Sequence, residues 1–123
     1  MPVVAIGTDF VALDRLRLVW EHHPKRFLQR HFTQEELEYC MSKADPLPSL
    51  GARFAAKEAF QKVWPENFGW RDVWVESDGR RPHLNFVEAI AHPMRLDGLR
   101  AHLSLSHERT HALAVVVLER LRP

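Results

Sequence analysis

The sequence predicts a single α+β domain, in which a small antiparallel sheet packs against one long helix. Apolar, β-branched runs lie near both ends of the chain, as strands require, and an alanine-rich stretch in the middle has helical spacing. Alternating segments on either side of turn residues indicate two hairpins in the second half of the chain. A chain of 123 residues suits one hydrophobic core, so one domain is expected over residues 1–123.

The N-terminal part of the chain begins with a strand and continues with helices. Residues 3–11 are β-branched and apolar on both faces, which predicts a buried strand. Asp14 is expected to cap a helix that runs to His23 and is stopped by Pro24. A short helical turn is expected at residues 26–30.

Helix-start signals delimit two further helices. Thr33 and Glu36 form a capping box, so a helix is expected from there to about Lys43. Ser49 is expected to cap the long helix, which Pro65 ends. The remaining expected elements are a hairpin of residues 73–76 and 83–86, a helix over 87–94, and a second hairpin of 103–106 and 112–118.

Composition and charge exclude several classes of protein. Hydrophobic residues make up 46% and charged residues 27%, which argues against disorder, and a net charge of only +1 gives no field for nucleic-acid binding. Cys40 is the only cysteine, so no intrachain disulfide can form, which favours a reducing compartment. The first apolar run is interrupted at Asp9 and lacks the basic leader of a signal peptide, and no run approaches the roughly 20 residues of a membrane helix. A cytoplasmic protein is therefore expected.

The long helix carries the first chemical signal. At about 100° per residue, one stripe of this helix consists of small apolar side chains that allow close packing. The stripe contains Ala52, Ala55, Ala56, Ala59 and Val63. Glu58 and Lys62 lie together at one edge of the stripe, and Arg53 and Lys57 lie at the other. Taken alone, Glu58 and Lys62 are most simply explained as an exposed i,i+4 ion pair.

Asp9 is a second carboxylate of interest, because it interrupts an apolar strand, where an unpaired charge is costly. A buried Asp needs a cation, a metal ion or a set of hydrogen bonds. Asp9 and Glu58 together provide the hard oxygen ligands that Mg²⁺ takes beside substrate phosphates, usually one or two carboxylates and several waters. Their spacing in the sequence does not show that the two side chains meet.

The C-terminal region contains a polar strand end and a zinc-like motif. Residues 103–107 alternate, so Ser104 and Ser106 share one face, which in most strands faces solvent. His107 to His111 reads His-Glu-x-x-His, a pattern that binds zinc only when both histidines share one face of a helix. The flanking residues instead predict a tight turn between strands. A zinc protease is an alternative that metal analysis would decide.

Four segments spread along nearly the whole chain form a recognisable set. They are Ile6-Gly7-Thr8-Asp9-Phe10 with Arg15; Phe27 to Thr33 with Glu36, Tyr39 and Cys40; Arg53-Phe54-Ala55-Ala56-Lys57-Glu58-Ala59 with Lys62; and Ser104-Leu105-Ser106-His107 followed by Ala112 and Ala114. In order and content these segments resemble the motifs of the bacterial holo-acyl-carrier-protein synthase family, whose chains have a similar length.

The chain departs from the family pattern at three places. Residues 64–67 read Trp-Pro-Glu-Asn where the family often has a Gly-Thr-Gly-like loop, so contacts of that loop are not carried over. The turn at residues 79–82 is one residue longer than the usual Gly-Lys-Pro. Phe54 stands where Trp is frequent.

The resemblance implies a pseudo-symmetric α+β fold, 4′-phosphopantetheinyl transferase-like, that assembles as a trimer with active sites between neighbouring subunits. It implies transfer of 4′-phosphopantetheine from coenzyme A to a serine of an apo acyl carrier protein, with Mg²⁺. The products would be holo carrier protein and adenosine 3′,5′-bisphosphate. Asp9 and Glu58 would hold the metal and, with Lys62 at the pyrophosphate, would form the catalytic set.

Coenzyme A would be bound by Lys62 and by three further residues carried over from the family, namely Arg53, Ser106 and His107. Arg53 and His107 would lie near its 3′-phosphoadenosine, from the neighbouring chain. The proton of the carrier serine would pass either to a water on the metal or to the carboxylate of Glu58.

The carrier protein is expected to meet a basic surface, because carriers are generally acidic along the helix after the modified serine. Arg15 and Arg26 would supply the charge, and Phe27 would be an apolar anchor. The same surface includes Arg17 and Lys25, for which a solvated basic face is an equally good explanation. A family member that binds coenzyme A or a carrier without catalysis is a further alternative, and the complete set of two carboxylates and a lysine argues against it.

Overall fold

The computed structural model describes residues 2–121 and has the mixed α and β fold that the sequence predicts. Its elements are β1 (Val3–Ala12), α1 (Leu13–His22), α2 (Pro24–His31), α3 (Gln34–Met41), α4 (Leu47–Gln61), β2 (Val73–Ser77), β3 (Pro82–Phe86), α5 (Glu88–Leu96), β4 (Leu99–His107) and β5 (His111–Arg120). Strands β1, β5 and β4 form one antiparallel sheet in that order, and β2 pairs with β3 in a separate hairpin. Both predicted hairpins are therefore confirmed.

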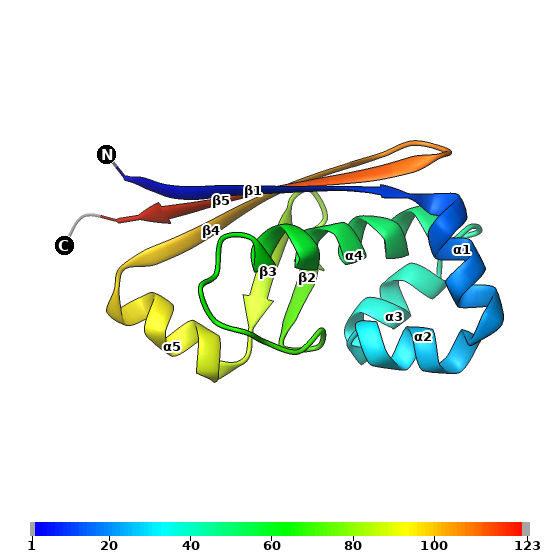
Figure 1. Cartoon of the computed structure of the whole chain (residues 1–123), viewed down its shortest axis with the longest axis horizontal. Coiled ribbons are helices and arrows are strands. Elements are labelled where there is room, and N and C mark those ends of the chain that lie inside the picture. Colours follow the sequence, from blue (N-terminus) through cyan, green and yellow to red (C-terminus); the bar gives the residue numbers. More distant parts are fainter. Residues whose placement is uncertain (1, 122–123) are drawn as a thin grey trace.

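Helix α4 lies along one face of the three-stranded sheet (Figure 1). Helices α1, α2 and α3 gather at one end of α4, and the β2–β3 hairpin and α5 lie toward the other end (Figure 1). The predicted alanine stripe faces the core, since Ala52, Ala55, Ala56 and Ala59 are all buried. No helix within residues 2–121 is long and apolar enough to cross a membrane.

Strand β1 and helix α4 approach each other very closely at Gly7. A Cβ atom at this position would lie 2.2 Å from the carbonyl oxygen of Ala59 and 3.0 Å from Cγ1 of Val63, so no side chain fits there. Asp9 lies two residues further along the same face of β1. The missing side chain of Gly7 therefore allows Asp9 to lie close to α4.

The start of α4 differs from the prediction. The helix begins at Leu47, with Pro46 at its N-cap position and Pro48 in its first turn, so Ser49 lies inside the helix and does not cap it. Proline is tolerated there because the first N–H groups of a helix have no partner within the helix. The helix ends at Gln61, shortly before the predicted end.

The remaining helix ends are a mixture of confirmed and corrected predictions. The capping box of Thr33 and Glu36 is present in both directions, with Glu36 N–H on Thr33 Oγ1 at 3.3 Å and Thr33 N–H on Glu36 Oε1 at 3.0 Å. Asp14 does not cap α1 but lies in its first turn, where a carboxylate is favourable near the positive helix end. Pro24 begins α2, which is longer than the expected turn.

Strand β1 is an edge strand, and the prediction that both its faces are buried is wrong for the isolated chain. One face packs against α4, but Ile6 and Phe10 on the opposite face are 63% and 65% exposed. A strand with one exposed apolar face has the same continuous run of apolar residues as a strand that is buried on both faces, so the sequence does not distinguish them. A chain with such a face exposes an apolar surface typical of an interaction site.

Candidate functional site

Asp9, Glu58 and Lys62 come together where β1 passes the C-terminal half of α4. Asp9 projects toward α4, because its pairing partner on β5, Ala114, is fully buried on that side of the sheet. Glu58 lies in the last turn of α4, and Lys62 follows at the C-cap position, four residues further on. The i,i+4 spacing therefore presents both side chains to the same part of β1.

Asp9 and Glu58 line one cavity of about 360 Å³ between β1, α1 and α4. Its other lining residues are Phe10, Val11, Ala12, Arg15, Leu16, Val19 and Phe54. Burial raises the pKa of the Glu58 carboxyl above its ordinary value, the nearby charge of Asp9 adds to this, and Lys62 opposes it. The two carboxylates thus share one mainly apolar cavity and repel each other.

Lys62 lies beside Asp9, which lines this cavity. Its Nζ atom is 3.6 Å from Oδ1 of Asp9 and donates a hydrogen bond to the carbonyl oxygen of Thr8 at 2.6 Å. More than half of the Lys62 side chain is exposed, so this ion pair contributes little to stability. Its position instead places an exposed cation beside Asp9.

The carboxylate pair suits a divalent cation. Carboxylate oxygens are the ligands that Mg²⁺ prefers, and a cation between Asp9 and Glu58 would remove their mutual repulsion. Within residues 2–121, no three or more His, Cys, Asp or Glu side chains are grouped so that they could hold a metal ion. A cation at Asp9 and Glu58 would therefore take its other ligands from water or from phosphate oxygens.

The zinc-protease alternative is wrong. His107 is the last residue of β4 and His111 the first residue of β5, so the motif does not lie on a helix. The N–H of Glu108 donates to the carbonyl oxygen of His111 at 2.9 Å and closes the turn that the sequence predicts. The two histidines cannot present the shared helical face that the zinc site requires.

Ser106 and His107 lie outside the Asp9–Glu58 cavity in the single chain. They line a second cavity of about 280 Å³, together with His111. Phe10 lines both cavities, and its ring stacks on that of His111 with a centroid separation of 4.5 Å. Ser104 and Ser106 are both exposed, as a solvent-facing side of a strand predicts.

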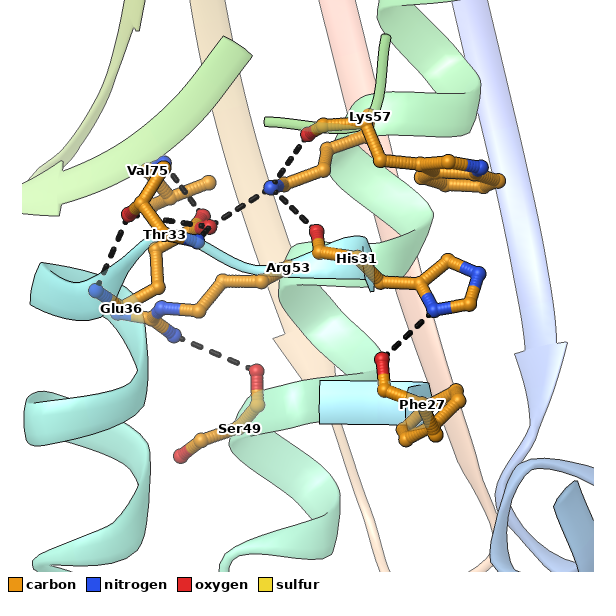
Figure 2. Close-up of polar contacts among 9 residues, drawn as sticks. Phe27, His31, Thr33, Glu36, Ser49, Arg53, Lys57 and Val75 are labelled. Carbon is orange, nitrogen blue, oxygen red and sulfur yellow. Dashed lines mark hydrogen bonds and ion pairs between the residues drawn. The ribbon is translucent and has the colours of Figure 1, made fainter. Parts of the chain in front are cut away.

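Arg53 reaches neither cavity. The residue is only 5% exposed, and its guanidinium lies over the ring of Tyr39 at 4.3 Å. One guanidinium nitrogen, Nη1, donates to the carbonyl oxygen of Ser49 at 3.4 Å (Figure 2). In this position Arg53 ties α3 to α4, and the structure does not bring it to the residues expected to bind coenzyme A.

The residues expected to contact a carrier protein are only partly exposed. Arg15 and Arg26 are exposed, and Arg15 also lines the Asp9–Glu58 cavity. Phe27 is only 2% exposed and belongs to the hydrophobic core, so the prediction of an exposed apolar anchor is wrong. The exposed apolar side chains of α1 are instead Leu18 and Val19, which the sequence analysis missed. The spacing of the buried leucines on α1 was the signal that could have revealed this outward face.

Comparisons with known proteins show the family to which the chain belongs. The family model of the 4′-phosphopantetheinyl transferase superfamily matches residues 5–116. A holo-[acyl-carrier-protein] synthase of Thermus thermophilus is 53% identical over 117 residues, covering 95% of this chain and 94% of that protein. The corresponding synthase of Deinococcus deserti is 51% identical over 125 residues, covering 95% and 98%.

Solved structures of holo-acyl-carrier-protein synthases have the same fold as this chain. A crystal structure of the holo-[acyl-carrier-protein] synthase from Neisseria meningitidis has a TM-score of 0.86 and 32% identity, covering 95% of this chain and 98% of that chain. A holo-(acyl-carrier-protein) synthase from Bacillus anthracis, in complex with CoA (3′,5′-ADP), has a TM-score of 0.78 and 28% identity, covering 98% and 100%.

Proposed function

The chain belongs to the 4′-phosphopantetheinyl transferase superfamily, and on this basis we propose that it makes holo acyl carrier protein in a magnesium-dependent reaction. It transfers 4′-phosphopantetheine from coenzyme A to a serine of the apo carrier and releases adenosine 3′,5′-bisphosphate. Its relatives are named for the same enzyme activity, and this chain spans nearly their whole length. With Cys40 as its only cysteine, it is expected to act in the reducing cytoplasm.

The observation that carries this proposal is the shared cavity of Asp9 and Glu58, with Lys62 beside Asp9. A cation held by the two carboxylates would neutralise charge on the pyrophosphate of coenzyme A. Lys62 would bind a phosphate oxygen; in support, its side chain is exposed and only weakly paired with Asp9.

The chemical step needs little covalent participation by the protein. The Oγ atom of the carrier serine attacks the β-phosphorus of coenzyme A, forming an O–P bond. The bond from that phosphorus to the bridging oxygen breaks, and adenosine 3′,5′-bisphosphate leaves with that oxygen. The serine proton must pass to a base, for which either a water at the cation or a carboxylate oxygen of Glu58 would serve. The protein mainly positions the two reactants.

One assay separates this function from simple binding. The protein is incubated with apo carrier protein, coenzyme A and Mg²⁺, and the intact mass of the carrier is measured. A mass gain equal to one 4′-phosphopantetheine group supports the transferase. A complex with coenzyme A or with the carrier, but without mass gain, would point instead to a binding module.

The uncovered face of the three-stranded sheet suits association with further copies of the chain. This face carries the apolar side chains Val4, Ile6, Phe10, Leu113, Val115 and Val117. Because Phe10 also lines both cavities, a neighbouring chain on this face would complete them. The assembly is taken to be the trimer that the family resemblance implies.

Sedimentation equilibrium is expected to give about three times the 14.4 kDa mass of one chain. Ile6→Glu places a charge in the centre of the apolar face and should return the protein to monomers, because a buried unpaired charge is costly. Arg17→Glu, on the exposed surface of α1, is the matched control and should remain assembled. A wild-type protein that sediments at 14.4 kDa would contradict the proposed trimer.

The carrier protein is proposed to dock on α1 and the start of α2. Arg15 and Arg26 provide exposed positive charge there, and Leu18 and Val19 replace Phe27 as the apolar contacts. Arg15 joins this surface to the cavity, so a docked carrier could present its serine to Asp9 and Glu58.

Raising the salt concentration is expected to increase the KM for the carrier on the order of tenfold, because salt screens the attraction that steers an acidic partner. The KM for coenzyme A, held at short range inside the cavity, should change much less. Both constants are measured with the carrier mass assay between low and high salt. Equal responses of the two constants would contradict this docking surface.

A further inference from the structure

Lys57 and Glu36 form a buried ion pair to which the proposed reaction gives no role. Each residue is only 1% exposed, and Nζ of Lys57 lies 2.7 Å from Oε1 of Glu36. Burial lowers the pKa of Lys57, and the charge of Glu36 and its hydrogen bond oppose this. Neither residue lines the cavity of Asp9 and Glu58.

The Lys57 ammonium group has all three of its donors satisfied. It donates to Oε1 of Glu36 and to the carbonyl oxygens of His31 and Trp70, at 2.7, 2.7 and 2.8 Å (Figure 2). Oε2 of Glu36 accepts from the N–H of Val75 at 2.8 Å. One ammonium group thus joins α4 to the end of α2, to α3 and to the loop that precedes β2.

Two of these acceptors belong to residues that support a wall of the carboxylate cavity. The Trp70 ring stacks on Phe54 with a centroid separation of 4.8 Å, and the His31 ring lies 5.6 Å from Phe54. The His31 and Trp70 rings also contact each other edge to face at 4.8 Å. Phe54 in turn lines the cavity with Glu58. A continuous set of contacts therefore runs from Lys57 to the cavity.

Stability alone is a weak reason for such a pair. Burying two charges costs about as much as their attraction returns, and apolar residues of similar volume often serve equally well or better. An apolar pair, however, cannot hold two backbone carbonyl groups in fixed directions. The hydrogen bonds of Lys57 do this, and they also fix the rotation of α4, on which Glu58 is the next residue.

We infer that Lys57 is a positioning residue for the carboxylate site. Its ammonium group holds the carbonyls of His31 and Trp70, so that their rings fix Phe54, and it holds α4 at the rotation that presents Glu58 toward Asp9. Glu36 keeps the ammonium group in place. This inference rests on the proposed function, because the site it organises is the proposed site for the cation and coenzyme A.

Three variants test the inference on the full chain. Lys57→Met removes the donors, and the double variant Glu36→Gln with Lys57→Met also removes the buried negative charge while keeping an amide oxygen that can accept the N–H of Val75. Trp70→Leu removes the supporting ring, and since Trp70 is only partly buried the chain should fold. Lys43→Met is the matched control, because Lys43 is an exposed lysine at the end of α3.

Folding is followed by circular dichroism. Mn²⁺ replaces Mg²⁺ in the binding experiment, because its binding can be measured by electron paramagnetic resonance. The values of kcat and KM for coenzyme A are measured per folded molecule. We expect Lys57→Met to have a lowered Tm, and the double variant to recover much of it. The double variant should still bind Mn²⁺ about tenfold more weakly and have a kcat/KM about tenfold lower, because small misplacements in such a site are costly. Trp70→Leu should show several-fold losses of the same kind, and Lys43→Met none.

Each result decides the question. A folded double variant, or a folded Trp70→Leu, with the Mn²⁺ affinity and kinetics of the wild type would mean that the pair is only structural. If the double variant does not fold, Trp70→Leu alone decides. If the wild-type protein transfers phosphopantetheine and the folded variants bind Mn²⁺ as tightly as it does, the inference is overturned but the proposed function stands. A wild-type protein that neither binds Mn²⁺ nor transfers the group contradicts the proposed function itself.

Discussion

Replacing either Asp9 or Glu58 by alanine is expected to lower kcat/KM for carrier modification by about 10²–10³-fold, while the fold survives. Each change would remove one of the two carboxylates proposed to hold the cation, and neither side chain supports the core, since both are partly exposed. The measurement is the rate of carrier mass gain at saturating Mg²⁺, with circular dichroism to verify folding.

Glu38→Ala is the matched control for this prediction. Glu38 is an exposed carboxylate on α3, outside the Asp9–Glu58 cavity, so its removal should leave the rate unchanged. Turnover near that of the wild type in Asp9→Ala or Glu58→Ala, at saturating Mg²⁺, would remove the metal assignment. The outcome does not depend on which group takes the serine proton.

The pH dependence gives a companion test of the same site without a mutation. The pKa of Glu58 is raised, so the folded protein keeps its proton to a higher pH than an ordinary glutamate does. A cation needs the ionised carboxylate, so protons and Mg²⁺ compete for the site. As the pH is lowered from 7 toward the raised pKa, the Mg²⁺ concentration for half-maximal rate should rise. A constant Mg²⁺ requirement over this range would argue against Glu58 as a ligand.

Gly7→Ala is expected to destabilise the fold by about 3 kcal/mol and to lower the activity of the folded fraction about 10²-fold. The new Cβ would lie 2.2 Å from the carbonyl oxygen of Ala59, and a backbone atom inside a helix cannot move aside cheaply. Strand β1 must therefore shift away from α4 and take Asp9 with it. Urea unfolding gives the stability, and the carrier mass assay gives the rate per folded molecule.

Gly51→Ala is the matched control, since it makes the same substitution at another close contact. A Cβ at Gly51 would lie 2.4 Å from Cδ2 of Leu13, which is the end of a side chain and can shift, although Leu13 is buried and must repack. Alanine is also the better helix former by about 1 kcal/mol, which offsets the crowding. Gly51→Ala should therefore have nearly the stability and rate of the wild type. If Gly7→Ala behaved in the same way, the close approach of β1 would not control the site.

Local signals predicted most of the fold. The capping box of Thr33 and Glu36 involves neighbouring residues, and its sequence pattern therefore determines it directly. The turn at residues 108–110 was likewise predicted from its flanks. The start of α4 was missed because Ser49 is a good N-cap residue, whereas the helix accepts prolines in its first turn.

Contacts between distant segments were harder to predict. Asp9 and Glu58 share a cavity because Gly7 lets β1 approach α4, and only the family resemblance indicated this pairing in advance. Glu36 could be assigned its cap from the sequence, but its pairing with Lys57 requires the packing of α3 against α4. Phe27 was wrongly assigned to the surface, because its position between cations concealed that α2 turns it inward.

Glu36 serves several elements with one carboxylate. It caps α3, accepts the N–H of Val75 on β2 and binds Lys57 on α4. None of these elements can open by itself without stranding a charge in the interior. The middle of the chain should therefore lose its structure in one cooperative step, as a single unit of hydrogen exchange.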